Sequence, residues 1–497
     1  MSKILLATSE AVPFAKTGGL ADVAGTLPIE LARLGHEVSV IMPAYRCVHD
    51  AGVTIHGTGI EFELPIGNQI ISGRFLEGRL PDSDVPIYFV KQDGYFDRAA
   101  LYSENGRDYR DNCQRFVFFC RAVMEAIRLL ELEIDLLHCN DWQTALLPVY
   151  LEAEYRHSPG FESLATLITV HNLAYQGVFW HWDMLLTGLD WKYFNWQQLE
   201  FYGDLNLLKG GIATADAINT VSPKYAEEIQ DSRLGCGLDG VLRNRSESLS
   251  GIINGVDYDI WNPVTDDRIS QNYDLQSWQA GKAACKQSLQ HELGLAADPD
   301  ALLLGFVGRL VEQKGVSLLV EAMQRWVHHS PVQWVILGSG EPQHEQSLRE
   351  LAESFPQRVA VRLEFSETLA HRIEAGSDAF LMPSRYEPCG LNQMYSLKYG
   401  TLPIVHSTGG LSDTILHASQ PHLDAKTANG FSFGSFDTGD LEATLGEVAD
   451  MYSNRREIWQ QLVQTGMTQD WSWKRSAQAY ADLYKQTIQK VRQTICA

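Results

Sequence analysis

The chain has 497 residues, of which 45% are hydrophobic and 21% charged, and its formal net charge is -22. This length exceeds what one hydrophobic core usually supports, so we expect two large domains of an ordinary globular protein. The negative charge disfavours nucleic acids and anionic membranes as partners, because both are polyanions.

The cysteines and the first residues bear on the cellular compartment. Eight cysteines are scattered along the chain without a C-x-x-C pair, which favours reduced thiols in the cytosol. The opening "MSKILLATSE" enters a strand directly, without the basic and apolar regions of a signal peptide, and no apolar run has transmembrane length. A cytoplasmic protein that does not bind membranes is therefore expected.

The first half of the chain alternates strand and helix patterns. Residues 3–7, "KILLA", predict a strand, a glycine loop follows, residues 20–35 have helical spacing, and "HEVSVIMP" predicts the next strand. This is a βαβ unit. Three further buried strands, each ending in polar residues, are predicted at 136–141, 165–172 and 216–222. In a parallel sheet such strand ends face a ligand.

The second half begins with a polar stretch, residues 266–300, in which 281–294 could form one helix. From Ala301 the alternation restarts, with a helix at 315–326. Strands are predicted at 301–310, 332–341, 378–384 and 402–410. Two doubly wound α/β domains are the economical interpretation.

A cationic loop follows the first strand of the second half. In "GFVGRLVEQKG", residues 305–315, Arg309 and Lys314 lie just before a predicted helix. Both cations could converge on a diphosphate, helped by glycines and by the partial positive charge of a helix N-terminus. Surface ion pairing is the alternative for an isolated cation, but in this loop we favour an anion site.

A second loop, "PSRYEPCGL", opens another helix near Leu391. Glu387 could accept hydrogen bonds from neutral hydroxyls, while backbone amides near Cys389, Gly390 and Leu391 point at the ligand. This mixture suits a sugar. A capping role for Glu387 is about equally compatible with its spacing, and Cys389 is expected to be a small packing residue, since its motif holds no histidine to activate it.

The glycine pair occurs twice, as "KTGGL" at 16–20 and "STGGL" at 407–411. Neither copy matches the common dinucleotide or P-loop fingerprints. Two sheets that each direct a glycine loop at one shared cleft would explain the recurrence.

Seven motifs together resemble the bacterial glycogen synthase and plant starch synthase family of retaining glycosyltransferases. They are "KTGGLADV", "HCNDW", "HNLAYQG", "INGVD", "GRLVEQKG", "PSRYEPCGL" and "STGGL", in this order over nearly the whole chain. The resemblance implies the α/β GT-B fold, two Rossmann-like domains facing across a deep cleft. The domains would be residues 1–250, completed by a final helix at 474–497, and residues 251–473.

The resemblance also implies transfer of glucose from ADP-glucose to the non-reducing end of an α-1,4-glucan, glycogen or a malto-oligosaccharide, with retention of configuration. No cofactor and no metal are expected, since the spacing of His138, Asp141 and His171 matches no standard metal site. The oligomeric state is left open.

The resemblance implies a role for individual residues in these motifs. The catalytic residues would be His171, Arg309, Lys314 and Glu387. Donor binding would use Lys16, Gly18, Gly19, Asn254, Phe365, Cys389, Gly390, Leu391, Thr408 and Gly409. The acceptor side would be shaped by Asp22, Asp141 and Trp142.

Two positions depart from the wider pattern. Tyr395 stands where many relatives in the superfamily have a second glutamate, as is usual in the glycogen and starch synthase branch. Phe365 replaces a tyrosine expected to stack on adenine, so UDP-glucose stays open as the donor.

The mechanism expected from the leaving group needs fixed positive charge rather than a strong general acid, because a nucleoside diphosphate departs as a stabilised anion. No pair of carboxylates suited to a retaining glycosidase is evident. The alternatives are a non-catalytic glucan-binding paralogue, a pyridoxal phosphate-dependent glucan phosphorylase and a nucleotide-sugar dehydrogenase or epimerase. Lys314→Ala is expected to lower turnover at least about a hundredfold and to leave stability almost unchanged, as for a flexible loop lysine.

Overall fold

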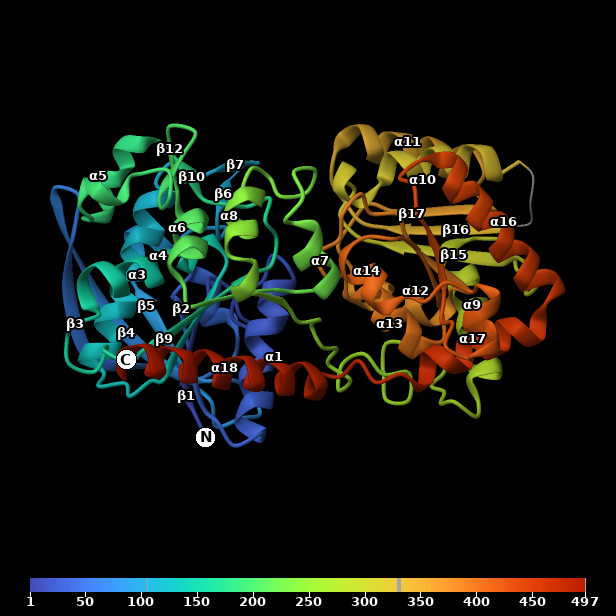
Figure 1. Ribbon diagram of the computed structural model, residues 1–497. Coiled ribbons are helices and arrows are strands. Elements are labelled where there is room, and N and C mark those ends of the chain that lie inside the picture. The colour runs from blue at the N-terminus through green and yellow to red at the C-terminus, as the bar shows by residue number, and fades with distance from the viewer. Residues whose placement is uncertain (105, 329–331, 497) are drawn as a thin grey trace. The chain divides into compact units, whose positions relative to one another are not determined.

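The computed structural model describes residues 1–104, 106–328 and 332–496. Contacts between Cα atoms divide the chain into two units, Met1–Gly255 with Trp473–Ala497, and Val256–Ser472 (Figure 1). The first boundary expected from the sequence, 250/251, lies five residues earlier. The chain stays in the first unit beyond residue 250 because strand β14 (Leu249–Gly251) pairs with the first unit's sheet.

The first unit contains a nine-stranded sheet with the order β14-β13-β9-β8-β1-β2-β5-β4-β3. Its parallel part is formed by β1 (Lys3–Ala7), β2 (Glu37–Pro43), β5 (Pro86–Lys91), β8 (Leu136–Asn140), β9 (Ala165–Val170), β13 (Ala217–Thr220) and β14. An antiparallel hairpin, β3 (His56–Ile66) and β4 (Gln69–Arg79), extends one edge through β5.

Helices cover this sheet on both faces, since every residue of β8 and β9 is buried. One group includes α1 (Gly19–Arg33) and the terminal helix α18 (Trp473–Cys496), which contact each other (Figure 1). The other includes α3 (Asn112–Leu129), α4 (Leu146–Tyr150) and α6 (Leu207–Thr214).

Two tyrosine hydroxyl groups of helix α18 contact side chains of the first sheet. Tyr484 Oη lies 2.8 Å from His138 Nδ1, and Tyr480 Oη accepts a hydrogen bond of 3.0 Å from the Asn219 amide. All four side chains are buried. The C-terminal segment is therefore an integral part of the first unit.

The second unit has a six-stranded parallel sheet with the order β17-β16-β15-β18-β19-β20. The strands are β15 (Leu302–Val307), β16 (Val332–Leu337), β17 (Val359–Arg362), β18 (Ala379–Met382), β19 (Leu402–His406) and β20 (Phe431–Phe433). The principal helices are α9 (Trp278–Leu293), α10 (Val316–Trp326), α11 (Pro342–Ser354), α12 (Glu367–Gly376), α13 (Asn392–Tyr399), α14 (Gly409–Thr414), α16 (Thr438–Asn454) and α17 (Arg456–Thr468).

Side chains of the second sheet alternate between two separate cores. Leu302, Leu304 and Phe306 of β15 belong to one core, whereas Leu303 belongs to the other. This alternation with a period of two is what a strand buried on both faces requires.

Both sheets reverse their strand order beside their first strand. In the first unit β1 lies between β8 and β2, and in the second unit β15 lies between β16 and β18. Ligands of open α/β sheets bind at such reversal points, beyond the carboxyl ends of the strands. The loops after β1, β8, β15 and β18 are therefore where a site is expected.

Candidate active site

The loop after β1 is organised by Glu10, a residue that the sequence analysis did not single out. Its carboxylate accepts hydrogen bonds from the Thr17 backbone N–H (2.5 Å), the Thr17 hydroxyl (2.6 Å) and Tyr102 Oη (2.7 Å). The side chain is buried, with 4% exposure. The Gly18 backbone N–H also donates to this carboxylate, at 3.3 Å. A buried carboxylate that accepts four hydrogen bonds fixes the shape of the loop that carries Lys16 and Gly18.

Lys16 and Asp22 form an ion pair in this loop. Lys16 Nζ donates to Asp22 Oδ1 at 2.7 Å, and both side chains are accessible to solvent. Asp22 lies in the first turn of α1. The lysine assigned to the donor and the aspartate assigned to the acceptor are thus direct neighbours.

Gly18 differs from a glycine that packing requires. Its backbone is extended, with φ -155°, and a Cβ atom placed there would meet no atom within 4 Å. Gly18 and Gly19 are exposed at the start of α1. The space beside Gly18, at the start of α1, is therefore not filled by other protein atoms.

His171 and Asp141 come from the ends of neighbouring strands β9 and β8. The His171 backbone N–H donates to Asp141 Oδ1 at 2.7 Å, and the ring Nε2 lies 2.9 Å from Asn140 Oδ1. Burial lowers the pKa of His171 to about 3 and raises the pKa of Asp141 to about 7, although both side chains keep some solvent contact. At neutral pH the histidine is therefore an uncharged hydrogen-bonding group.

Trp142 is wedged among aromatic rings at the start of the segment after β8. Its ring centroid lies 4.9 Å from that of Phe116 and 5.7 Å from that of Phe179, in edge-to-face contacts. Gly177 has φ +63°, and a Cβ atom there would lie 2.5 Å from the indole. The "HNLAYQG" motif thus ends in a glycine because the chain passes directly over Trp142.

Asn254 lies at the end of the first unit and is 4% exposed. Its Oδ1 accepts no hydrogen bond from the residues that the structure describes. An unsatisfied buried amide oxygen is uncommon, and a ligand hydroxyl is one group that could satisfy it.

In the second unit, the cationic loop follows β15 as predicted. Arg309 is exposed and donates to Gln313 Oε1 at 3.2 Å. Gly315 has φ +70°, and a Cβ atom there would lie 1.9 Å from the Pro383 carbonyl oxygen. Only glycine allows this approach, which brings the loop after β15 against the loop after β18.

That approach places Lys314 beside Glu387. Lys314 Nζ donates to Glu387 Oε2 at 2.6 Å, and the Ser384 hydroxyl donates to the same oxygen at 2.9 Å. The Lys314 side chain is 23% exposed and that of Glu387 is 8% exposed. Two of the three residues predicted to be catalytic in this unit, Lys314 and Glu387, therefore form an ion pair. Lys314 is thus a held side chain rather than a flexible loop lysine.

The second glycine pair packs against the Glu387 loop. Gly409 has φ +45°, and a Cβ atom there would lie 2.0 Å from the Glu387 carbonyl oxygen. The Gly410 N–H donates to the carbonyl oxygens of Glu387 and Pro388, both at 3.2 Å. Thr408 and Cys389 are buried at this junction, in keeping with a packing role for the thiol.

The other donor positions follow β17 and precede α13. Gly390 has φ +73°, and Gly390 and Leu391 are partly exposed. The Phe365 ring lies beyond β17 and is 90% exposed, so it is accessible to a stacking partner. Tyr395, in contrast, stacks on Trp261 at 4.0 Å with an interplanar angle of 3°.

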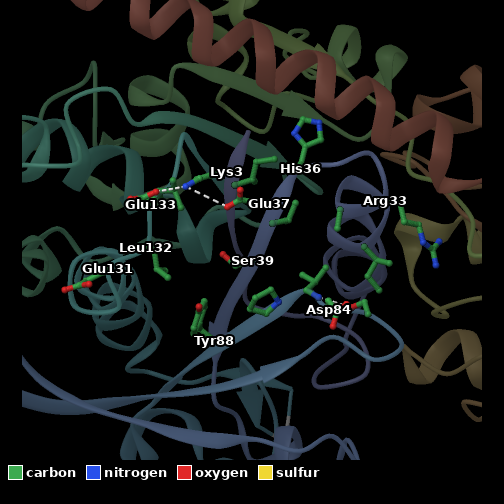
Figure 2. Close-up of a pocket in the computed structure, with 18 of the residues that line it drawn as sticks. Lys3, Arg33, His36, Glu37, Ser39, Asp84, Tyr88, Glu131, Leu132 and Glu133 are labelled. Carbon is green, nitrogen blue, oxygen red and sulfur yellow. Dashed lines mark hydrogen bonds and ion pairs between the residues drawn. The ribbon is translucent and has the colours of Figure 1, made fainter. Parts of the chain in front are cut away.

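The pocket drawn in Figure 2 lies at the opposite edge of the first sheet. It has a volume of about 810 Å³ and is lined by residues at the amino ends of β1, β2 and β5, including Lys3, Glu37 and Tyr88. Lys3 Nζ donates to Glu133 Oε2 at 2.5 Å and lies 3.9 Å from Glu37 Oε2 (Figure 2). The residues predicted for the site are not among those that line it.

Within the described residues, no helix is long and apolar enough to cross a membrane. The same residues contain no cluster of three histidine, cysteine or acidic side chains suited to a metal ion.

Comparisons with known proteins match both units. The starch synthase catalytic domain family matches residues 3–244, and the family of glycosyl transferases group 1 matches residues 293–461. The chain is 46% identical to a glycogen synthase of Rhodopirellula baltica over 98% of both chains. It is 43% identical to a glycogen synthase of Thermotoga maritima, over 98% of this chain and 99% of that one.

The chain belongs to the glycogen and starch synthase family. The catalytic domain of Arabidopsis thaliana starch synthase IV, solved with ADP and acarbose, superposes with a TM-score of 0.89 at 32% identity, over 98% of this chain and 99% of that one. A sucrose-phosphate synthase from Thermosynechococcus elongatus, 16% identical with a TM-score of 0.59, shares the fold.

The predicted GT-B fold class is therefore confirmed, and so is the predicted function of a glycogen or starch synthase, a glycosyltransferase. As a member of this family, the chain is expected to bind a nucleotide sugar and a glucan.

Proposed function

We propose that this glycogen/starch synthase transfers glucose from ADP-glucose to the non-reducing end of an α-1,4-glucan with retention of configuration. The observation that carries the proposal is the Lys314 and Glu387 pair at the strand reversal of the second sheet, with exposed Arg309 in the same loop. These residues supply two cations that could bind a diphosphate and one carboxylate that could accept hydrogen bonds from sugar hydroxyls.

ADP-glucose is proposed as the donor on two grounds. A starch synthase 32% identical to this chain was solved with ADP and the oligosaccharide acarbose. In addition, the exposed ring of Phe365 is suited to stacking on a purine. UDP-glucose is the alternative donor that the experiment below must test.

The proposed chemistry rests on charge placement. Arg309 and Lys314 would stabilise the negative charge that develops on the departing diphosphate, which makes a strong general acid unnecessary. Glu387 Oε2 would hold the Lys314 ammonium while Oε1 accepts a hydrogen bond from a sugar hydroxyl. His171 is neutral at physiological pH and would bind the transferred glucose without giving up a proton.

The remaining predicted residues are proposed in supporting roles. Lys16, Gly18 and Gly19 would contact the donor phosphates, Asn254 the sugar, and Cys389, Gly390, Leu391, Thr408 and Gly409 would shape the donor side. Asp22, Asp141 and Trp142 would shape the acceptor side. Retention is proposed to follow from attack on the face that the leaving group vacates, assisted by the departing phosphate.

The test is incubation with radiolabelled ADP-glucose or UDP-glucose together with maltoheptaose. Extension of the oligosaccharide, faster with ADP-glucose, supports the proposal, and the anomeric configuration of the new linkage can be read by NMR. Faster extension with UDP-glucose would overturn the donor assignment, and extension with neither would overturn the function.

We also propose a cytoplasmic location. None of the seven cysteines whose side chains the structure describes forms a disulfide bond, as suits a reducing compartment.

A further inference from the structure

Asn140 is a fully buried polar residue that the chemistry proposed above does not use. It ends β8, which lies between β9 and β1 in the first sheet. Its Nδ2 donates to the Ala7 carbonyl oxygen at 3.1 Å, and its Oδ1 lies 2.9 Å from Nε2 of His171. Ala7 ends β1 and His171 directly follows β9. Asn140 therefore links the ends of three adjacent strands, and one of its two contacts is the ring assigned to the glucose.

The contact with Ala7 determines which end of the Asn140 amide faces the histidine. A carbonyl oxygen only accepts hydrogen bonds, so the amide atom beside the Ala7 oxygen must be the nitrogen, which carries the N–H groups. The amide oxygen then faces the His171 ring. Two acceptors form no hydrogen bond with each other, so the ring nitrogen at 2.9 Å, Nε2, must carry a proton.

The His171 ring is uncharged, and this determines the state of its second nitrogen. Burial lowers the pKa of His171 to about 3. A neutral imidazole has a single N–H group, which the contact with Asn140 assigns to Nε2, so Nδ1 has a lone pair and can only accept. Nδ1 has no hydrogen-bond partner among the residues that the structure describes. The ring therefore has one unused acceptor.

An amide partner differs from the carboxylate that another histidine of this chain has. In the second unit, Nδ1 of His371 lies 2.7 Å from Asp266 Oδ2, and both side chains are fully buried. A carboxylate beside a histidine stabilises the imidazolium form, because the two charges attract, whereas a neutral amide has no charge to contribute. The Asp141 carboxylate accepts from the backbone N–H of His171 and not from its ring. Asn140 therefore orients the ring without favouring its charged form.

We propose that Asn140 is a positioning residue that keeps the proton of the His171 ring on Nε2, so that Nδ1 accepts a hydrogen bond from a hydroxyl group of the transferred glucose. This inference rests on the proposed function, since it specifies which ring nitrogen of the proposed sugar-binding histidine meets the sugar. A neutral acceptor suits this place, because an imidazolium would repel the positive charge that develops at the anomeric carbon in an oxocarbenium-like transition state.

Nitrogen-15 NMR of the histidine side chains tests the position of the proton, because protonated and unprotonated ring nitrogens differ in chemical shift. The signals of His171 are those missing from His171→Ala. We expect the Nε2–H tautomer in the unaltered protein at neutral pH without substrate, and a mixture with the Nδ1–H tautomer in Asn140→Ala.

The NMR measurement separates this inference from the proposed function, because it needs no activity. An Nδ1–H tautomer or an imidazolium in the unaltered protein would overturn the inference, while transfer of glucose by the same protein would still uphold the proposed function. The unaltered protein can give this result even if Asn140→Ala does not fold.

A double-mutant cycle tests whether Asn140 acts through His171. Asn140→Ala is expected to lower turnover about tenfold in the otherwise unaltered enzyme, and by less than about twofold when His171→Ala is already present. Residues that acted independently would give the same loss in both backgrounds, and that result would contradict the inference.

Asn219→Ala is the matched control. Asn219 is also a fully buried asparagine of the first sheet, in β13, and its amide donates to Tyr480 Oη at 3.0 Å. We expect it to lower the melting temperature about as much as Asn140→Ala, to keep turnover within about twofold of the unaltered enzyme, and to keep the Nε2–H tautomer of His171. An equal loss of turnover in the two variants would show that Asn140 only supports the fold, and would overturn the inference.

Discussion

Lys314 and Glu387 form an ion pair of 2.6 Å in which the carboxylate is almost fully buried. The pair joins loops that follow two adjacent strands, β15 and β18. Each residue therefore has a structural consequence besides its proposed chemical role, and the two can be separated by experiment.

Replacing Lys314 should affect both activity and stability. Lys314→Ala is expected to reduce turnover at saturating ADP-glucose by about a hundredfold or more, because one preorganised positive charge is lost. It should also lower the free energy of unfolding by roughly 1–3 kcal/mol, since the buried Glu387 carboxylate loses a charged partner. The expectation from sequence that stability would barely change took Lys314 for a flexible, solvated side chain, whereas the structure holds it against Glu387.

The double variant Lys314→Ala/Glu387→Gln provides the decisive comparison. Stability should recover in part, because the uncompensated charge is gone, while turnover stays low. Lys224→Ala is the matched control, since Lys224 pairs with Glu227 on the surface at 2.9 Å and should change neither property by much. Near-normal turnover in Lys314→Ala would contradict the catalytic assignment.

The two glycine pairs should respond oppositely to the same substitution. Gly18→Ala should melt close to the unaltered protein, because its backbone is extended and its Cβ would meet no neighbour. The added methyl group would occupy the space proposed for the donor phosphates, so the KM for ADP-glucose should rise several-fold. Differential scanning calorimetry and initial rates measure the two effects.

Gly409→Ala should instead destabilise the second unit by about 2 kcal/mol or more, because its backbone is left-handed and its Cβ would collide with the Glu387 carbonyl oxygen. If Gly18→Ala proved the less stable of the two, or left the KM unchanged, the distinction between an open and a packed glycine pair would be wrong.

Phe365→Ala should weaken ADP binding by about tenfold, the scale of one lost base-aromatic stacking contact. Because the ring is 90% exposed, the melting temperature should be unchanged. Phe365→Tyr should bind ADP as the unaltered protein does, since its ring can stack equally. Isothermal titration with ADP distinguishes these variants, and equal affinity for Phe365→Ala would show that adenine stacks elsewhere.

His138 should contribute to the pH dependence of the free energy of unfolding. Burial lowers its pKa to about 3 in the folded protein, from an ordinary value of 6.5. Below pH 6.5 the unfolded chain therefore binds a proton that the folded chain does not, and the free energy of unfolding falls as the pH decreases towards 3. The slope is at most about 1.4 kcal/mol per pH unit for this group.

Between pH 6.5 and pH 4.5, the free energy of unfolding should therefore fall by roughly 1–2 kcal/mol less for His138→Asn than for the unaltered protein. Urea unfolding at the two pH values provides the measurement. His49→Asn, at an exposed position, is the control and should keep the full dependence. Parallel curves for all three proteins would show that His138 does not remain neutral.

Patterns of apolar residues predicted most of the parallel strands, and "KILLA" coincides with β1. The parallel strands β5, β14, β17 and β20 were not predicted. Helix α18 was expected from the resemblance to the family, which implied a final helix at 474–497. The hairpin β3 and β4 was not predicted. Its strands alternate exposed and buried residues, but glycines interrupt the pattern and its register shifts between Gly57 and Glu61.

For the candidate site, the motifs singled out Lys314 and Glu387 as candidates but did not predict their ion pair. The contact depends on how closely two loops approach at Gly315 and Pro383, which the motifs do not show. Glu10 could not be found either. Two of its hydrogen-bond donors are backbone N–H groups, which any residue supplies and which therefore leave no trace in the sequence.

The contact between His138 and Tyr484 joins residues 346 positions apart. At a synthesis rate of about 5–20 residues per second, the ribosome would synthesise Tyr484 roughly 20–70 s after His138. During that interval the nascent first unit has a sheet whose interior histidine and asparagine lack their partners from α18. Its completion is thus tied to translation of the entire second unit, and we expect ribosome-bound chains truncated before residue 473 to be trapped by chaperones.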